Sequence, residues 1–211
     1  MKKNLFDDAY NTPNLVFGSQ STRILAKYLD ENPLNQGIAL DLGCGEGRDT
    51  IPLLKRGLNV TAVDKSPVGI NKLLKRLETE KISKDMLTTN ACDVLNFDWT
   101  ADYYDLVVGI TLLDHLDKEQ GLKVATKIIE ATKKGGIVFM EVLTDRDPAV
   151  THNNPVSEFA EAIEHYFGAN ELLDIFSKYL RVLIYEDRLE WDYDHGEPHK
   201  HGCASLLGIK K

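Results

Sequence analysis

A glycine-rich loop follows an apolar run in the sequence GIALDLGCGEGRDT. The run Gly37–Leu42 has the character of a buried strand and contains the carboxylate Asp41, and Gly43, Gly45 and Gly47 follow at alternate positions. Glycine permits positive φ angles and close approach of the backbone to a ligand, and a helix beginning after such a loop has unpaired N–H groups. Ligands of parallel α/β sheets bind at the carboxyl ends of the strands. We therefore expect the amides and the acid of this loop to hold a ligand.

Two further features of the loop bear on the type of ligand. The dinucleotide fingerprint GxGxxG requires a third glycine, and Arg48 occupies that position. The phosphate loop GxxxxGK[ST] is absent from the sequence. The carboxylate of Asp41 would repel a pyrophosphate and would suit a ligand with a cationic portion. These features count against an NAD(P)-dependent oxidoreductase, which stays open as an alternative.

The segment LDLGCGEG resembles motif I of the class I methyltransferases that depend on S-adenosylmethionine (SAM). SAM carries a sulfonium and an ammonium group, so an acid before the glycines makes electrostatic sense. The resemblance implies that SAM is the cofactor, that S-adenosylhomocysteine is its product, and that the motif residues bind it: Asp41, Gly43, Cys44, Gly45 and Gly47. A non-catalytic protein that binds SAM or its product is a further alternative.

A second carboxylate ends the next predicted strand, in the sequence VTAVDKS. Asp64 at this place can accept both hydroxyls of a ribose, and Lys65 is expected beside the cofactor. A ribose is common to SAM and NAD, so this feature does not separate the two. The alternative is that Asp64 only caps the helix that Ser66 and Pro67 begin.

Two later segments extend the resemblance to this family. In NACDVLNF, Asp93 occupies the place of the acid that binds the adenine amino group, with Cys92 beside the ring. The segment YDLVVGITLLDHL resembles the fourth strand and the turn that line the methyl-transfer cavity, and it places Ile110 there. The resemblance covers roughly residues 37–143.

His115 is the candidate general base, because it follows the predicted strand Asp105–Ile110 on the ligand side of the sheet. A hydroxyl or ammonium acceptor needs a base with a pKa near the working pH, whereas a thiolate or an oxyanion does not. The neighbouring Asp114 could orient the imidazole. A purely structural role for this histidine stays open.

Four other residues are expected around the sulfonium or the acceptor. Arg48 either pairs with the SAM carboxylate or an anionic acceptor, or lies at the surface. Phe6, Tyr10 and Phe17 either form an aromatic lid, since aromatic faces favour cations, or serve only as packing residues.

Three histidines in the sequence DHGEPHKHG form a second candidate cluster. His195, His199 and His201 could be metal ligands, since imidazole suits zinc, copper and nickel, part of the acceptor pocket, or an exposed turn. Residues 199 and 201 share a face only where a strand has already begun. No fourth ligand is specified, and we expect no bound metal.

The methyl acceptor is expected to be a small molecule. The net charge of −8 counts against a nucleic-acid partner. The motif [DN]PP[YF], which enzymes acting on base or amide nitrogens generally carry in this family, is replaced by GITLLDHL. The segments DLGCGEGRDTIPLLKRGLNVTAVDKSPVGI and HGCASLLGIKK most resemble small methyltransferases of the tellurite-resistance type.

Strand-like and helical patterns alternate along the chain, as in a parallel sheet covered on both faces. The predicted strands are Gly37–Leu42, Asn59–Asp64, Asp105–Ile110 and Ile137–Leu143, and the predicted helices are Ser21–Leu29, Asp49–Arg56, Pro67–Glu80 and Lys118–Thr132. After Asn170 we expect a short capped helix and then two long strands around a turn. The predicted fold class is α/β, a Rossmann-like doubly wound, mostly parallel sheet with helices on both faces and a C-terminal antiparallel hairpin.

The 211 residues are expected to form one domain. Residues 1–36 would be a lid or flank, 37–143 the cofactor-binding core, and 144–211 the substrate-side helices and hairpin. Three well-separated cysteines indicate a reducing compartment. The N-terminus lacks the apolar segment of a signal peptide, and no apolar run is long enough to span a membrane. We expect a cytoplasmic monomer or homodimer.

Overall fold

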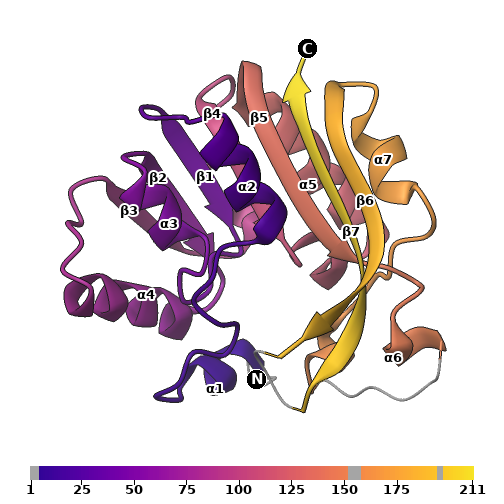
Figure 1. Ribbon diagram of the computed structural model, residues 1–211, viewed down its shortest axis with the longest axis horizontal. Helices are drawn as coiled ribbons and strands as arrows, with labels where there is room; N and C mark the ends of the chain where they lie inside the picture. Colours follow the sequence, from indigo (N-terminus) through magenta and orange to yellow (C-terminus); the bar gives the residue numbers. More distant parts are fainter. Residues whose placement is uncertain (1–4, 152–157, 194–196) are drawn as a thin grey trace.

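The computed structural model describes residues 5–151, 158–193 and 197–211, and these form a seven-stranded sheet flanked by helices (Figure 1). The strand order is β3-β2-β1-β4-β5-β7-β6. The strands are β1 (Ile38–Leu42), β2 (Asn59–Asp64), β3 (Leu87–Ala91), β4 (Tyr104–Ile110), β5 (Thr132–Leu143), β6 (Leu180–Asp192) and β7 (His199–Lys210). The first five strands are parallel, and β7 runs antiparallel between β5 and β6. This arrangement confirms the predicted fold class.

Helices cover both faces of the sheet and form two hydrophobic layers. The α-helices are α1 (Leu5–Tyr10), α2 (Arg23–Glu31), α3 (Thr50–Lys55), α4 (Pro67–Thr79), α5 (Lys118–Ala131), α6 (Pro148–Thr151) and α7 (Glu171–Phe176), and the 3-10 helices are η1 (Val94–Asn96), η2 (Leu113–His115) and η3 (Glu158–Ala162). One layer packs α2, α3 and α4 against the sheet, and the other packs α5 and α7. None of the helices in these described ranges is both long and apolar enough to cross a membrane.

The central strands are mostly apolar because both of their faces are covered. In β1, Leu40 and Leu42 join the layer of α5, while Ala39 joins the layer of α2. All three side chains are fully buried. Successive strand residues point to opposite faces, so a strand covered on both sides has no polar alternation. This burial is the physical reason that the strands were recognisable as short apolar runs.

A helix cap accounts for the start of α4. Ser66 Oγ accepts a hydrogen bond from the amide of Gly69 at 3.0 Å, and Pro67 occupies the first helical position, as predicted. The expected cap at Asn170 is wrong, because this residue has a φ of 61° and its side chain makes no capping hydrogen bond. Asn tolerates this left-handed conformation better than most residues do.

The strand β5 and the helix α1 differ from the sequence-based expectation, and β3 was not among the predicted strands. The strand expected at Ile137 begins at Thr132 instead, because Thr132 pairs with Tyr104 across a register shift in β4. The stretch Lys133–Gly136 therefore lies inside β5. The short helix α1 was not predicted from the sequence pattern. It packs on α4 and brings the N-terminal segment to the carboxyl end of the sheet.

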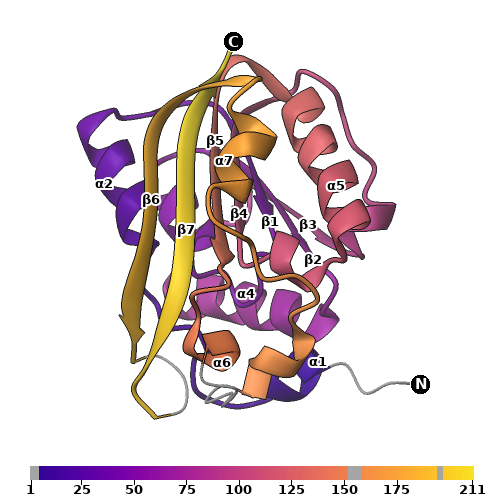
Figure 2. The same cartoon turned by 90° about the vertical axis from the view of Figure 1, so that its right-hand side faces the viewer.

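The hairpin of β6 and β7 is long, and its turn end lies near α6 (Figure 2). Gly202 allows the segment after β5 to contact β7 closely. A Cβ at this position would lie 2.6 Å from the backbone N of Asp147 and 2.8 Å from the carbonyl carbon of Arg146. These neighbours are backbone atoms and cannot move aside as a flexible side chain would. Gly202 thus fixes how the hairpin meets the segment that carries Asp147.

Gly202→Ala is expected to lower the free energy of unfolding by about 1–3 kcal/mol, the usual cost of overpacking. Chemical denaturation monitored by circular dichroism measures this change. Gly168→Ala is the matched control, because its Cβ would meet only side-chain atoms at 3.7 Å or more. Equal stability of the two variants would contradict the close approach at Gly202.

Candidate active site

A cavity of about 640 Å³ lies at the carboxyl ends of the parallel strands. It is lined by the loops after β1, β2 and β4, by the segment before α2, and by the turn end of β6 and β7. Eleven of the twelve predicted site residues line it: Asp41, Gly43, Cys44, Gly45, Arg48, Asp64, Lys65, Cys92, Asp93, Ile110 and His115. Gly47 does not line the cavity. It packs against α4 instead, where a Cβ would lie 2.3 Å from Leu73 Cδ1.

The loop after β1 has the conformation that requires its glycines. The φ angles of Gly43, Gly45 and Gly47 are 72°, 50° and 85°, which L side chains rarely adopt. However, the amides of Gly43 and Cys44 donate to the carbonyl oxygen of Val63 at 2.8 and 3.1 Å. The expectation that these amides hold the ligand is therefore wrong. They tie the loop to β2, and the loop offers the ligand a closely approachable surface.

Asp41 lies in the cavity wall with only 4% of its surface exposed. The hydroxyl of Thr50 donates a hydrogen bond to its Oδ2 atom. Burial, reinforced by the nearby charge of Asp49, raises the pKa of Asp41 to about 7. A cationic group beside it would favour the ionised form. Asp41 therefore lines the cavity, as expected, although its carboxylate already accepts a hydrogen bond from the first turn of α3.

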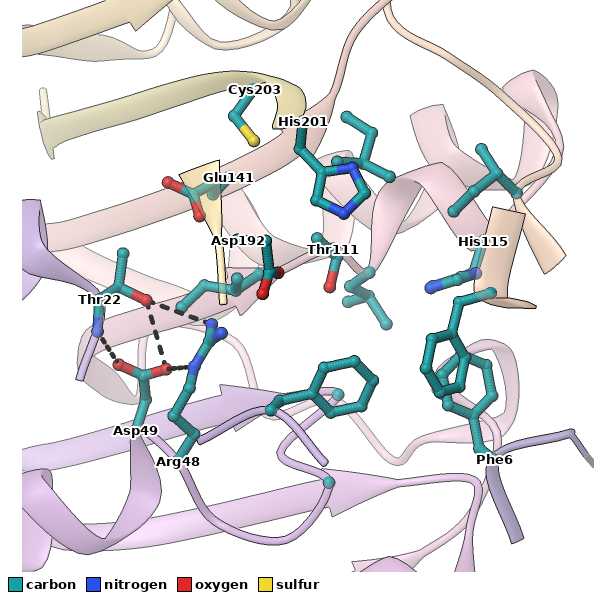
Figure 3. Close-up of a pocket in the computed structure, with 18 of the residues that line it drawn as sticks. Phe6, Thr22, Arg48, Asp49, Thr111, His115, Glu141, Asp192, His201 and Cys203 are labelled. Atoms are coloured by element: carbon teal, nitrogen blue, oxygen red, sulfur yellow. Dashed lines mark hydrogen bonds and ion pairs between the residues drawn. The ribbon is translucent and has the colours of Figure 1, made fainter. Parts of the chain in front are cut away.

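Arg48 fastens the start of α2 to the glycine loop and is not simply a surface residue. Its Nε atom donates to Asp49 Oδ2 at 3.1 Å, and its Nη2 atom donates to Thr22 Oγ1 at 3.3 Å (Figure 3). Asp49 also accepts hydrogen bonds from Ser21 Oγ at 2.7 Å and from the Thr22 amide at 2.9 Å. A guanidinium has five N–H donors, so Arg48 can keep these partners and still bind a carboxylate.

Asp64 connects three segments at the end of β2. Its Oδ2 atom accepts from the amide of Gly45 at 2.8 Å, and its Oδ1 atom accepts from the amide of Ser66 at 2.7 Å. Burial raises the pKa of this carboxyl. A carboxylate offers about four lone-pair sites, so acceptor capacity remains for two ribose hydroxyls. Beside it, the Lys65 ammonium lies 5.1 Å from the centre of the Phe6 ring.

The residues expected around the adenine line the same cavity. Asp93 Oδ1 accepts from the amide of Leu95 at 2.9 Å and caps η1, which fixes the direction of the carboxylate. Burial raises the pKa of the Cys92 thiol, so the sulfur is neutral at neutral pH. Ile110 ends β4 and contributes an apolar wall.

His115 presents one basic nitrogen. Its Nδ1 atom lies 2.9 Å from the carbonyl oxygen of Ala162, and because a carbonyl only accepts, Nδ1 carries the proton and Nε2 is basic. Burial lowers the pKa of His115, so the imidazole is neutral at neutral pH. Its ring packs edge-on against Phe6 at 5.0 Å, and Phe6 stacks on Phe159 at 5.6 Å.

Asp114 does not orient this imidazole, which corrects the sequence-based expectation. Its side chain is fully buried, and its oxygens lack a well-formed hydrogen bond to any of the described residues. Burial raises its pKa to about 7. The orienting group of His115 is the backbone of Ala162, from a segment far away in the sequence. No local pattern could have indicated that contact.

Two of the three clustered histidines line the cavity. The strand β7 begins at His199, so His199 and His201 share one face of it. His201 Nδ1 lies 2.8 Å from Asp147 Oδ2. Burial alone would raise the pKa of Asp147, but the hydrogen bond from His201 and the amides of Ala149 and Gly202 hold that pKa below its usual value. The exposed-turn interpretation is wrong for these two residues, and His195 lies outside the described residues.

Sequence reasoning missed a charged cluster on the last three strands. Arg188 Nη2 lies 2.9 Å from Glu141 Oε2, and its Nη1 atom donates to Ser205 Oγ at 2.6 Å. The three residues come from β6, β5 and β7 in turn, and Arg188 and Glu141 line the cavity. Their pairing depends on the order of the strands, which no short motif encodes.

Comparison with known proteins relates part of the chain to a protein family. Residues 39–136 match a family model described as a methyltransferase domain. This match covers β1 to β4 and the start of β5, including the glycine loop and Asp64. Residues 39–136 therefore resemble a methyltransferase domain. The family match gives no support to the NAD(P)-dependent alternative.

Similar proteins agree with this assignment. The chain is 27% identical over 165 residues to the probable SAM-dependent methyltransferase TehB of Haemophilus influenzae, covering 76% of the chain and 50% of TehB. It is 27% identical over 186 residues to a ubiquinone biosynthesis O-methyltransferase of Rickettsia felis, covering 80% of the chain and 72% of the relative. The chain thus spans about half the length of the TehB sequence.

Two solved structures share the fold of this chain. The crystal structure of TehB from Haemophilus influenzae aligns with a TM-score of 0.72 at 23% identity, covering 98% of the chain and 66% of TehB. The N-methyltransferase NodS from Bradyrhizobium japonicum, in complex with S-adenosylhomocysteine, aligns with a TM-score of 0.69 at 19% identity, covering 97% and 96%.

Asp114→Asn is expected to flatten the dependence of stability on pH. A pKa raised to about 7 means that the folded chain holds a proton that the unfolded chain releases near pH 4. Wild-type stability should therefore fall as the pH rises from about 4 to 7, by about 1.4 kcal/mol per pH unit for each such group. Urea denaturation at several pH values measures the difference, and equal slopes for variant and wild type would contradict the assignment.

Proposed function

We propose that this methyltransferase domain transfers a methyl group from SAM to a small-molecule acceptor by in-line displacement. The observation that carries the proposal is that a single cavity holds both the Gly45–Asp64 unit and the basic nitrogen of His115. SAM supplies a methyl group on a positively charged sulfur, which is already an activated leaving group. The chain then has to bind the donor, align the acceptor and exclude water.

The cavity wall fits the cofactor. Asp64 would accept from the ribose hydroxyls, Asp93 would accept from the adenine amino group, and Asp41 with Arg48 would bind the charged methionine end. At Gly45 a Cβ would lie 2.4 Å from Tyr10 Oη, so a larger residue would displace the Tyr10 side chain. The glycine therefore lets the N-terminal segment close directly over the loop.

The N-terminal segment and η3 supply an aromatic wall on the acceptor side. Phe6 and Phe17 lie 5.6 and 5.1 Å, centre to centre, from the ring of Phe159. The opposite wall is polar and includes Arg188 and Asp192. An acceptor with an apolar body and one polar end would match both walls. Holding reactants in line contributes up to about 7–11 kcal/mol to lowering the barrier.

His115 would serve as the general base for an acceptor that must lose a proton. Its Nε2 atom is basic and the imidazole is neutral at neutral pH, which is the state that a base requires. The relatives in ubiquinone biosynthesis are O-methyltransferases, and hydroxyl acceptors are a class that benefits from a base. Cys44, Cys92 and Cys203 are free thiols, which suits activity in the reducing cytoplasm.

Asp64→Asn should weaken the binding of S-adenosylhomocysteine by about 1–3 kcal/mol, because an amide leaves a buried hydroxyl without its acceptor. Titration calorimetry measures this affinity. The matched control is Asp105→Asn, which changes a carboxylate that Lys133 pairs with outside the cavity. Unchanged affinity in Asp64→Asn would refute the ribose assignment.

His115→Gln should leave the affinity for S-adenosylhomocysteine unchanged and reduce kcat by about 10²–10⁴-fold, the usual contribution of a general base. Conversion of SAM to S-adenosylhomocysteine is followed with a panel of phenol, thiol and amine acceptors. Because burial lowers the pKa of His115, the wild-type rate should fall only below about pH 6.5, and the variant should lose this acid limb. The control is His165→Gln, whose ring pairs with Glu171 away from the cavity. Equal rates in the wild type and His115→Gln would reduce His115 to a packing role.

A further inference from the structure

The residue that follows β4 has a strained backbone. Thr111 has a φ of 46°, and it is the only β-branched residue with a positive φ in the part of the chain that the structure describes. This conformation is a genuine outlier for a β-branched side chain, whereas glycine adopts it without strain. Strain of this kind clusters at functional sites. The side chain of Thr111 therefore stands where the backbone alone would favour glycine.

The surrounding contacts hold Thr111 in this conformation. Its amide donates to the carbonyl oxygen of Glu141 at 2.9 Å, which extends the pairing of β4 with β5. The next side chain, Leu112, packs on the glycine loop, where a Cβ at Gly43 would lie 3.4 Å from Leu112 Cδ1. The carbonyl oxygen of Leu112 then accepts from the amide of His115 at 3.2 Å in η2. The chain is thus fixed on both sides of Thr111, and the strain is retained.

The hydroxyl of Thr111 is available to a bound molecule. Thr111 and His115 both line the cavity, and in Figure 3 the side chains of both point into it. Thr111 Oγ1 makes no hydrogen bond to any residue in the described ranges, and it is not among the buried polar atoms that lack a partner there. A threonine hydroxyl has one donor and two acceptor sites. This group therefore offers the cavity a donor at a fixed position.

The combination of Thr111 and His115 fits a hydroxyl acceptor. His115 Nε2 is basic and takes a proton, whereas Thr111 Oγ1 can donate one in a hydrogen bond. A hydroxyl oxygen can donate to His115, accept from Thr111 and still attack with its second lone pair. An amine nitrogen has a single lone pair, which the attack consumes. A thiolate needs no base.

We propose that Thr111 is a catalytic residue that donates a hydrogen bond to the hydroxyl oxygen of the acceptor, and that hydroxyl compounds are the acceptor class. This proposal rests on the proposed methyl transfer. The acceptor oxygen forms the new bond to the methyl carbon, and the carbon–sulfur bond of SAM breaks with its electron pair on sulfur. The hydroxyl proton moves to His115 Nε2. The hydrogen bond from Thr111 stabilises the negative charge that develops on the oxygen as the proton leaves.

Two substitutions test the hydroxyl of Thr111. Thr111→Val keeps the branched shape and the strain, and it should lower kcat with phenol acceptors by about 10–100-fold, the usual loss of a hydrogen bond to a charged group. The loss should be smaller with thiol acceptors, since sulfur is a weak hydrogen-bond acceptor. Thr111→Ser keeps the hydroxyl and should recover most of the activity that Thr111→Val loses. Calorimetry with S-adenosylhomocysteine should give the same affinity in both variants as in the wild type.

A third substitution tests the strain. Thr111→Gly should raise the melting temperature measured by circular dichroism, because glycine adopts the left-handed conformation freely, and it should lower kcat with phenols because the hydroxyl is lost. The matched control is Lys81→Gly, which replaces another residue of positive φ, at 55°, outside the cavity. This control should raise the melting temperature and leave kcat unchanged.

Equal kcat of Thr111→Val and the wild type with phenols would overturn this proposal and leave the methyl transfer standing. Equal losses with phenols and thiols, or turnover of amines alone by the wild type, would overturn the assignment of hydroxyl acceptors. A lower melting temperature in Thr111→Gly than in the wild type would contradict the strain. A wild type that binds S-adenosylhomocysteine but methylates no acceptor of the panel would overturn the proposed function, and the role of Thr111 with it.

Discussion

The cavity depends on the two hydrogen bonds that Asp64 accepts from Gly45 and Ser66. These bonds join the end of β2 to the glycine loop after β1 and to Ser66, the residue that caps α4. A buried carboxylate is costly unless its oxygens are satisfied, and here both oxygens have backbone donors. The same geometry directs the remaining lone pairs of Asp64 toward the cavity. One side chain therefore holds the loop in place and, under the proposed function, would also accept from the ribose hydroxyls.

The N-terminal segment is held over this unit by a second buried acid. Glu46 Oε1 accepts from the amides of Val16 and Phe17 at 2.6 and 2.9 Å, and Glu46 Oε2 lies 2.7 Å from the ammonium of Lys72. Glu46 is the residue between the second and third glycines of the loop. The glycine loop and the N-terminal segment are thus parts of one hydrogen-bonded structure, which explains how Tyr10 reaches within contact distance of Gly45.

The sequence-based predictions match the structure where the pattern that carries them lies within a short stretch of the chain. The strands β1, β2 and β4 and the glycine loop were predictable because apolar runs, glycine spacing and terminal acids lie within a few residues of each other. Contacts that cross the sheet were not predictable. Tertiary packing determines which groups contact Arg48 and His115, and it brings Arg188 to Glu141. It also turns the side chain of Asp114 away from His115, although the two residues are neighbours in the sequence. His199 and His201 were only partly predictable. Their spacing can be read from the sequence, but the start of β7 at His199, which places both side chains on one face, cannot.

A crystal structure of the protein with S-adenosylhomocysteine tests the central claim most directly. The account predicts that the two ribose hydroxyls lie within hydrogen-bond distance of the Asp64 carboxylate, with the sulfur facing the chamber between His115 and His201. The ligand should leave the bonds from Gly45 and Ser66 to Asp64 intact. A ligand bound elsewhere, or a ribose that does not touch Asp64, would contradict the account.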